Sequence, residues 1–500
     1  MKINQYKGGI IINYISLFLG NIISIIYTPI MLRLLGQSEY GLLNLSNTVI
    51  SYLGLLNMGM GASYIRYYSR YKSKGQEEKI SELNSMYLVV FFVLGVLVVL
   101  CGSIVVWLSP HVFASNLDNM QLHSMRIILW LSIVNLALSF PLGVFRLYTE
   151  ANERFVFLKV TNILFSVMAP LFNIPVLLLG YKSVALTVVS LSLNLATTIM
   201  TIAYSVRVLH IKFNFKHRDY RLLKEIFVFS SFLLLNQITD IITWSTDKIL
   251  LGAFCGTSVV AIYAIASQFN LYFQQFVSSI YGVFVPRINL LVASENKKDA
   301  NVLFNKLGRI QFFLVSLILS GFCLFGKEFI KLWAGKEYSN SYYVALLLMI
   351  PAGIPYLQSI GIEIQKAMNK HKFRSILLLL IAILNFVISI PLSKNYGEIG
   401  AALGTSIALV IGPIVIMNIY YHKVIKLNMF IFWREIASMA KGMIVPVLFT
   451  VLVKQIIDFS GFKLLVVGIL TYCIVYIASF YLFSFNQDEK RMLFRWRKRK

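Results

Sequence analysis

The sequence predicts an all-α integral membrane protein with about 14 transmembrane helices. We expect two pseudo-repeated six-helix lobes and an extra C-terminal helix pair, with both termini in the cytoplasm. Hydrophobic residues make up 58% of the 500-residue chain, charged residues make up 13%, and the mean hydropathy is +0.74. Soluble domains average about 45–50% apolar and 25% charged residues, so a soluble fold is excluded. Two further observations support this fold class. The chain has long charge-free runs, and its 46 Lys and Arg, which outnumber its 21 Asp and Glu, are unevenly distributed along it.

Fourteen apolar runs have the length that a membrane-spanning helix needs, about 20 residues. They cover approximately 8–32, 42–64, 87–108, 127–145, 160–181, 183–206, 226–253, 259–285, 310–326, 342–362, 375–393, 399–421, 436–453 and 464–485. Residues 249–286 carry no charge, and we expect the small residues 252–258 to form the turn that divides the seventh run from the eighth. The runs are continuously apolar and lack the alternation of a lipid-exposed strand, which favours helices over a barrel.

The basic residues predict the orientation of the chain. If successive connections alternate between the two sides of the membrane, 35 Lys and Arg fall on the side of the termini and 9 on the opposite side. Positive residues collect in cytoplasmic connections, so this side is expected to be the cytoplasm. The positive surplus therefore reflects topology, and we expect no nucleic-acid binding. The basic tail, residues 486–500, is expected to lie on anionic lipid.

A weak internal repeat divides the chain into two halves. Gly180 and Gly397 are 217 residues apart, as are Ala185 and Ala402. Two six-helix lobes are typical of transporters in which one lobe moves against the other around a central site. We expect one lobe at 1–210, a second at 211–425, an extra helix pair at 426–485 and the tail at 486–500.

Local motifs resemble those of a known transporter family. They are Tyr27-Thr-Pro-Ile-Met-Leu-Arg-Leu-Leu-Gly-Gln-Ser-Glu-Tyr-Gly41, Asn57-Met-Gly-Met-Gly61 with Arg66-Tyr, Thr246-Asp-Lys-Ile-Leu-Leu-Gly252 and Ala261-Ile-Tyr-Ala-Ile-Ala266. The chain is similar in these motifs, and along its whole length in helix number and loop lengths, to polysaccharide repeat-unit flippases. These Wzx-type proteins of O-antigen, capsule and exopolysaccharide synthesis belong to the MATE-like superfamily, together with multidrug exporters and lipid II flippases.

The resemblance implies a non-enzymatic protein of the bacterial cytoplasmic (inner) membrane. It would move undecaprenyl-pyrophosphate-linked sugar units to the outer leaflet by alternating access, with possible proton or sodium coupling and a possible association with polysaccharide polymerase machinery. Its binding partners would be the lipid-linked oligosaccharide and membrane lipids. Two alternatives are a drug or metabolite antiporter of the same fold and a membrane polymerase or ligase. The polymerase or ligase is disfavoured because the connections on the outer side of the membrane are short and poor in charge.

Four basic residues at cytoplasmic helix ends are candidates for binding the pyrophosphate headgroup: Arg66, Arg146, Arg287 and Lys366. Arg suits bidentate phosphate contacts. The same residues also satisfy the positive-inside rule and can extend to the interface. Arg146 with Glu150, and Lys366 with Glu363, can instead form ordinary ion pairs along a helix.

Ionisable residues within a membrane span are functional candidates because a charge in the bilayer is costly. Asp240 and Asp247 lie two helical turns apart and are candidates for ion coupling, the alternative being acids satisfied by neighbouring polar groups. Amides in the first, seventh and eighth runs are candidates for sugar hydroxyls or for interhelical hydrogen bonds. They are Asn13, Asn21, Asn236, Gln237, Asn270 and Gln274.

The sequence lacks the motifs that several kinds of chemistry require. There is no Gly-x-x-x-x-Gly-Lys-Ser/Thr loop for ATP, so any uphill transport would depend on an ion gradient. The four cysteines are scattered, without a Cys-x-x-Cys pair, which indicates neither a metal site nor a disulfide framework. We therefore expect no catalytic residues, no bound metal and no cofactor.

Overall fold

Helices account for all the regular structure that a computed structural model of the chain describes, which is residues 5–216, 220–294, 297–487 and 489–490. These residues contain no strand. The chain forms two compact units, Met1–Ala261 and Ile262–Lys500. The prediction of an all-α membrane protein is confirmed.

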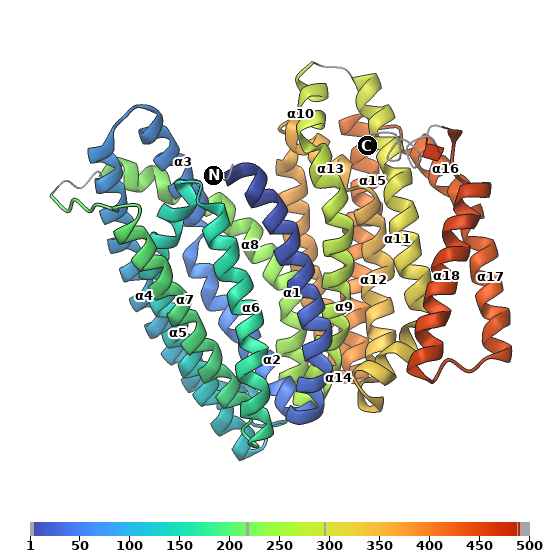
Figure 1. The fold of residues 1–500 in the computed structure, drawn as a ribbon, viewed down its shortest axis with the longest axis horizontal. Coiled ribbons are helices and arrows are strands. Elements are labelled where there is room, and N and C mark those ends of the chain that lie inside the picture. Colours follow the sequence, from blue (N-terminus) through green and yellow to red (C-terminus); the bar gives the residue numbers. More distant parts are fainter. Residues whose placement is uncertain (1–4, 217–219, 295–296, 488, 491–500) are drawn as a thin grey trace. The chain divides into compact units, whose positions relative to one another are not determined.

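The first unit consists of the helices up to the start of α9. Its elements are α1 (Gln5–Leu35), α2 (Gln37–Leu53), the 3-10 turn η1 (Gly54–Asn57), α3 (Met60–Ser73), α4 (Glu77–Phe113), α5 (Asn119–Ala151), α6 (Phe155–Leu178), α7 (Ser183–Arg207) and α8 (Tyr220–Phe254). Helix α5 packs along both α4 and α7, and α6 packs against α1 (Figure 1). The resulting bundle of α1, α5, α6 and α7 holds the site described below.

The second unit contains most of α9 and all later helices. Its elements are α9 (Thr257–Tyr281), η2 (Gly282–Phe284), α10 (Val285–Ala293), α11 (Lys297–Trp333), η3 (Lys336–Tyr338), α12 (Ser341–Leu357), α13 (Ser359–Ala367), α14 (His371–Leu409), the π-helical η4 (Val410–Ile416), α15 (Met417–Tyr420), the π-helical η5 (Tyr421–Ile425), α16 (Met429–Met439), α17 (Lys441–Ile456) and α18 (Phe462–Phe483). Helices α17 and α18 run side by side, and α18 packs against α11 (Figure 1).

The described residues include ten helices that are long and apolar enough to cross a membrane, or up to eleven if the bent pair α12 and α13 is one span. The chain is therefore a multi-pass membrane protein. The count of 14, the cytoplasmic position of the termini and the lobe boundaries stay predictions. The tail lies largely outside the described residues, since 488 and 491–500 are not described.

Three breaks in the helices lie at glycines. The turn predicted at 252–258 is confirmed, because α8 ends at Phe254 and Gly256 has a φ of 88°. The expectation of one continuous helix over 42–64 is wrong: Met58 and Gly59 adopt left-handed conformations between η1 and α3. Gly397, with φ 57° and ψ −136°, interrupts α14 between the eleventh and twelfth predicted runs. Glycine reaches these angles without a steric penalty.

Helix α2 packs closely against α8 and the beginning of α9. Gly41 is so near the Thr257 backbone that a Cβ atom would lie 1.8 Å from its carbonyl oxygen. The Ser38 and Thr257 hydroxyls are 3.0 Å apart, and farther along the helices the Tyr52 and Thr246 hydroxyls are 2.6 Å apart. Small residues allow such close approach of membrane helices, and hydroxyl pairs add to the attraction.

The substitution Gly41→Ala should destabilise the protein, because the added methyl group must push α2 away from Thr257. Overpacking of this kind costs about 1–3 kcal/mol, which thermal unfolding of the purified protein would show as a lower Tm. Gly54→Ala is the matched control, since nothing lies within 4 Å of a Cβ at that position. Equal Tm values for the two variants would contradict the close packing.

A buried arginine fixes the C-terminal helices to α11. Arg309 is only 5% exposed. Its Nε donates to Glu489 Oε1 at 2.7 Å, its Nη1 donates to Glu435 Oε2 at 2.7 Å, and its Nη2 donates to the Ser484 carbonyl at 2.8 Å. One guanidinium thus joins α11, α16 and the chain after α18. Two turns farther along α11, the Tyr476 hydroxyl lies 2.6 Å from that of Ser316.

Replacing Arg309 with methionine should lower the Tm strongly, because the change leaves buried Glu489 without its cation. Breaking a buried pair from one side costs about 3–5 kcal/mol. Arg221→Met is the matched control, because the Arg221–Glu225 pair is exposed and 3.8 Å long, and such pairs contribute about 1 kcal/mol or less. The second change Glu489→Gln should restore part of the stability lost in Arg309→Met. A Tm for Arg309→Met no lower than that of the control would refute this role.

Candidate functional site

One face of α7 carries a row of polar side chains. Thr187, Ser190, Asn194, Thr197 and Thr201 follow one another at intervals of three or four residues. This spacing places them on one side of a helix. Polar groups within a bilayer must be satisfied inside the protein, so this side turns toward the neighbouring helices α5 and α6.

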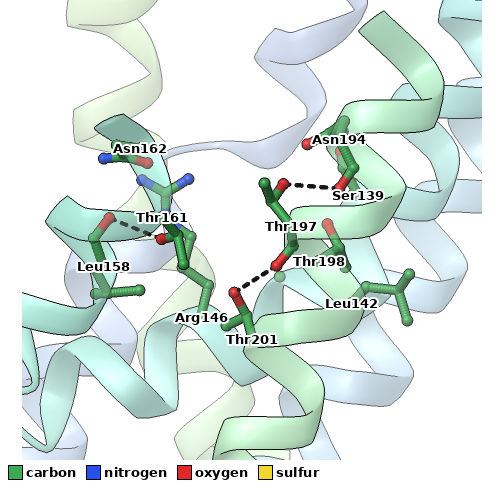
Figure 2. A pocket seen from close by; sticks show the side chains of 11 residues that line it. Ser139, Leu142, Arg146, Leu158, Thr161, Asn162, Asn194, Thr197, Thr198 and Thr201 are labelled. Atoms are coloured by element: carbon green, nitrogen blue, oxygen red, sulfur yellow. Dashed lines mark hydrogen bonds between the residues drawn. The ribbon is translucent and has the colours of Figure 1, made fainter. Parts of the chain in front are cut away.

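A pocket lies where this row faces α5 and α6. It has a volume of about 110 Å³. Figure 2 shows its lining, which comprises Ser139, Leu142, Gly143 and Arg146 of α5, Leu158, Thr161 and Asn162 of α6, and Asn194, Thr197, Thr198 and Thr201 of α7. Among these 11 side chains only Arg146 is charged. The site is therefore a concave, hydroxyl-rich surface with a single positive charge.

The guanidinium of Arg146 extends beside Thr161 and Asn162, with the threonines of α7 across the pocket (Figure 2). Arg146 and Glu150 are both described, and no ion pair joins them. The alternative of an ordinary pair along α5 is thus wrong for Arg146. An exposed arginine without a carboxylate partner keeps its full capacity for bidentate contact with an anion.

The hydroxyls around Arg146 hold the helices in their local conformation. Thr161 donates to the Leu158 carbonyl at 2.9 Å, Thr197 to the Asn194 carbonyl at 3.0 Å and Thr201 to the Thr197 carbonyl at 2.8 Å. A hydroxyl that donates in this way can still accept through its oxygen, and its proton can rotate toward another acceptor. The pocket therefore suits a ligand that accepts from Arg146 and exchanges hydrogen bonds with hydroxyls.

Arg66 belongs to a different environment. It lies on α3, and its guanidinium is 5.0 Å from the centre of the Phe229 ring on α8. Close by on α3, the Tyr68 hydroxyl donates to Asn152 Oδ1 at 2.8 Å. Burial raises the pKa of Tyr68, so this hydroxyl stays protonated as a donor. The structure does not bring Arg66 into the pocket of Arg146.

The other two headgroup candidates lie in the second unit. Arg287 is exposed on α10. Lys366 is exposed on α13, and its Nζ lies 2.8 Å from Glu363 Oε1. The ordinary ion pair considered for Lys366 is thus confirmed, which leaves this lysine less available to a phosphate than Arg146.

The two acids of α8 have different surroundings. Asp240 is exposed, whereas Asp247 is only 1% exposed. Asp247 lies near the Tyr52 hydroxyl of α2 and next to Lys248 in sequence. Asp240 is therefore the more accessible of the two carboxylates.

The amide candidates are dispersed over both units. Asn21 and Gln237 are half-buried, Asn236 and Gln274 are exposed, and Asn270 is buried. Asn13 lies in α1, but its side chain is outside the part that the structure describes. None of the five whose side chains are described lines the pocket of Arg146. Within the described part of the chain, no three His, Cys, Asp or Glu side chains come together to hold a metal ion.

The pocket also contains residues that are not among the candidates predicted from the sequence. Asn194, Thr197, Thr198 and Thr201 lie within a predicted apolar run, although their spacing is a detectable signal. A polar row at helical period within a membrane span predicts a face turned to protein or water. The contribution of Thr161 and Asn162 from α6 depends on tertiary packing and has no comparable signal.

The fold is that of a multi-pass membrane protein whose first unit contains a polar, singly charged pocket. Residues 7–292 match the family model described as "Polysaccharide biosynthesis protein". The chain belongs to this polysaccharide biosynthesis protein family, which confirms the resemblance inferred from its motifs. A multi-pass position in the bacterial cytoplasmic membrane fits the family.

Two relatives cover most of the chain. The "Uncharacterized membrane protein EpsK" of Bacillus subtilis (strain 168) is 21% identical over 98% of this chain and 97% of its own length. The "Putative O-antigen transporter" of Shigella flexneri is 23% identical over 78% of this chain and 91% of its own.

Solved structures show the same fold. A lipid II flippase MurJ in an inward closed conformation aligns over 95% of this chain and 98% of its own, with a TM-score of 0.72 and 15% identity. An inward-facing multidrug resistance MATE family transporter aligns over 82% of this chain and 96% of its own, with a TM-score of 0.63 and 14% identity.

Proposed function

We propose that the protein translocates undecaprenyl-pyrophosphate-linked oligosaccharide units across the cytoplasmic membrane by alternating access, for the synthesis of a surface polysaccharide. The family supports a transport role in polysaccharide synthesis, and the relative from Shigella flexneri is named as an O-antigen transporter. The observation that carries the proposal at the level of residues is the pocket of Arg146. It offers one exposed cation, which forms no ion pair within the described part of the chain, among the hydroxyls of three neighbouring helices.

Arg146 would bind the pyrophosphate of the lipid. A planar guanidinium can form two parallel hydrogen bonds to phosphate oxygens, which a lysine ammonium cannot. Binding must remain reversible for transport, and a single arginine with neutral neighbours provides attraction without the several charges of a tight phosphate site. Arg66, Arg287 and Lys366 would attract the headgroup electrostatically at other points of its path.

Reconstitution into liposomes with a fluorescent undecaprenyl-pyrophosphate oligosaccharide tests this function. Flipped lipid would be protected from a membrane-impermeant quencher. Arg146→Gln should slow protein-dependent flipping about tenfold or more, since hydrogen bonds to charged groups contribute roughly 1.5–3 kcal/mol. Arg146→Lys should be intermediate, because it keeps the charge but loses the bidentate geometry.

The control for this experiment is Arg126→Gln, which removes an exposed arginine from the same helix outside the pocket. It should flip the lipid like the unmodified protein. Arg146→Gln activity equal to that of Arg126→Gln would reject the role of Arg146. No protein-dependent flipping of any lipid-linked glycan would reject the function and favour the small-molecule antiporter.

Asp240 is the proposed ion-coupling group, because it is an exposed carboxylate on a membrane-spanning helix. Asp247 is the second candidate, although its burial restricts access to water.

Asp240→Asn should therefore abolish the acceleration of flipping by an imposed pH or sodium gradient while leaving slow flipping without a gradient. Flipping is measured with each gradient and again after an ionophore has removed that gradient. The comparison shows whether protons or sodium ions accelerate flipping. Asp458→Asn, in the connection between α17 and α18, is the control. An undiminished response to the gradient in Asp240→Asn would exclude this residue from coupling.

A further inference from the structure

The connection between α7 and α8 begins as an extended segment that is bound to α4. Residues 208–216, which we call the strap, follow the end of α7 at Arg207 and form no helix. Figure 1 shows the strap as the green segment that leaves α7 at the margin of the first unit. The backbone N–H of Asn214 donates to the Ser81 carbonyl of α4 at 3.1 Å, and Nδ2 of Asn84 donates to the Lys212 carbonyl at 2.9 Å. The strap is therefore held along the beginning of α4.

Buried side chains fix this attachment. Asn84 is only 1% exposed, and its Oδ1 accepts a hydrogen bond from the buried Tyr64 hydroxyl of α3 at 2.6 Å. The ring of Phe213 packs on that of Phe145 of α5, with 5.9 Å between the ring centres. Successive side chains of an extended segment point to opposite sides. Because Phe213 points to the helices, its neighbour Lys212 is presented outward, and Lys212 is exposed.

The outward side of the strap combines positive charge with apolar groups. Its cations are Lys212 and Lys216, together with Arg207 at the end of α7, and all three are exposed. None of the three forms an ion pair within the described part of the chain. Val208 is 54% exposed and Phe215 is 55% exposed. Such a mixture of basic and apolar side chains is typical of segments that lie in a membrane interface.

The position of the strap along α4 places it at the level of the lipid headgroups. In the predicted run 87–108, large apolar side chains are exposed from Val89 to Leu108. This distance of 19 residues is about 28 Å along the helix, which matches the hydrocarbon core of a bilayer, about 30 Å. Asn84 and Ser81 precede Val89 by five and eight residues, or about 8 and 12 Å. The headgroup layer extends about 5–8 Å beyond the core on each side, so the strap lies at its edge.

Anionic phospholipid fits this surface better than other occupants. Basic residues near such a lipid surface gain about fivefold in affinity for each cation. A phospholipid without net charge would leave the three cations uncompensated. An acidic soluble protein would meet the cations, but Phe215 at this depth is adjacent to lipid. The acids of α4 near the attachment, Glu78 and Glu82, form no ion pair with the described residues of the strap.

We propose that the strap binds the anionic phospholipids of the surrounding bilayer. Arg207, Lys212 and Lys216 contact the phosphodiesters, while Val208 and Phe215 enter the boundary between headgroups and acyl chains. The strap opens the connection between the two predicted lobes, so this lipid contact ties that connection to the membrane surface. The strap does not line the pocket of Arg146, and its lipid contact does not depend on which cargo the protein transports.

Hydrogen–deuterium exchange of the full chain in nanodiscs tests this lipid contact. The nanodiscs contain phosphatidylcholine with increasing fractions of phosphatidylglycerol. Phosphatidylglycerol should slow exchange of the strap amides in the unmodified protein, and high salt should reverse the effect, because salt screens exposed charges. The double variant Lys212→Gln and Lys216→Gln should need about 30-fold more phosphatidylglycerol for the same protection. Lys212→Arg and Lys216→Arg together should keep the protection, because both positive charges remain.

The control is the double variant Lys372→Gln and Lys423→Gln, which removes two exposed lysines of the second unit on the side predicted to be cytoplasmic. It should keep the protection of the strap. Unchanged protection in Lys212→Gln with Lys216→Gln would overturn the proposal. Equal loss in the two glutamine double variants would assign the effect to the charge of the whole face and also overturn it, as would full protection by phosphatidylcholine alone.

Discussion

The absence of water from the bilayer core is the constraint on which this structure depends. Backbone groups there must be paired within their own segment, which accounts for the wholly helical fold of the described residues. Polar side chains are subject to a similar demand. Those of α7 turn toward α5 and α6, where some of their hydroxyls bond to backbone carbonyls and others line cavities. The need to hide polarity from lipid and the need to present it to a hydrophilic cargo are thus met by the same face of one helix.

Breaks in the helices follow the same physics. A residue with a left-handed conformation interrupts the hydrogen-bond ladder, and glycine adopts it at the lowest steric cost. Gly256 lies between α8 and α9, and Gly397 within α14. Length and composition located both breaks, because the charge-free stretch 249–286 is longer than one span and must turn, and because Lys394 and Glu398 separate the two runs on either side of Gly397. The run at 42–64 has the length of one span, so hydropathy gave no reason to divide it, although Gly59 does so.

The candidate site was less predictable than the fold. Arg146 could be selected from sequence because a basic residue at the end of a span has few explanations. Sequence could not distinguish it from Lys366, however, because both have an acidic residue within one helical turn. The structure separates them, since Lys366 pairs with Glu363, whereas Arg146 forms no ion pair with a carboxylate of the described residues. Thr161 and Asn162 reach the pocket of Arg146 only through the packing of α6 against α7. The polar row of α7 was detectable, because helical periodicity is a local property.

We propose that one arginine in the helical bundle of the first unit, Arg146, recognises the headgroup. Cryo-electron microscopy of the full chain in nanodiscs with an undecaprenyl-pyrophosphate oligosaccharide tests this most directly. We predict pyrophosphate density within hydrogen-bonding distance of the Arg146 guanidinium, and its loss in Arg146→Gln. Well-defined lipid-linked sugar bound elsewhere, with Arg146 free of any phosphate, would contradict the assignment.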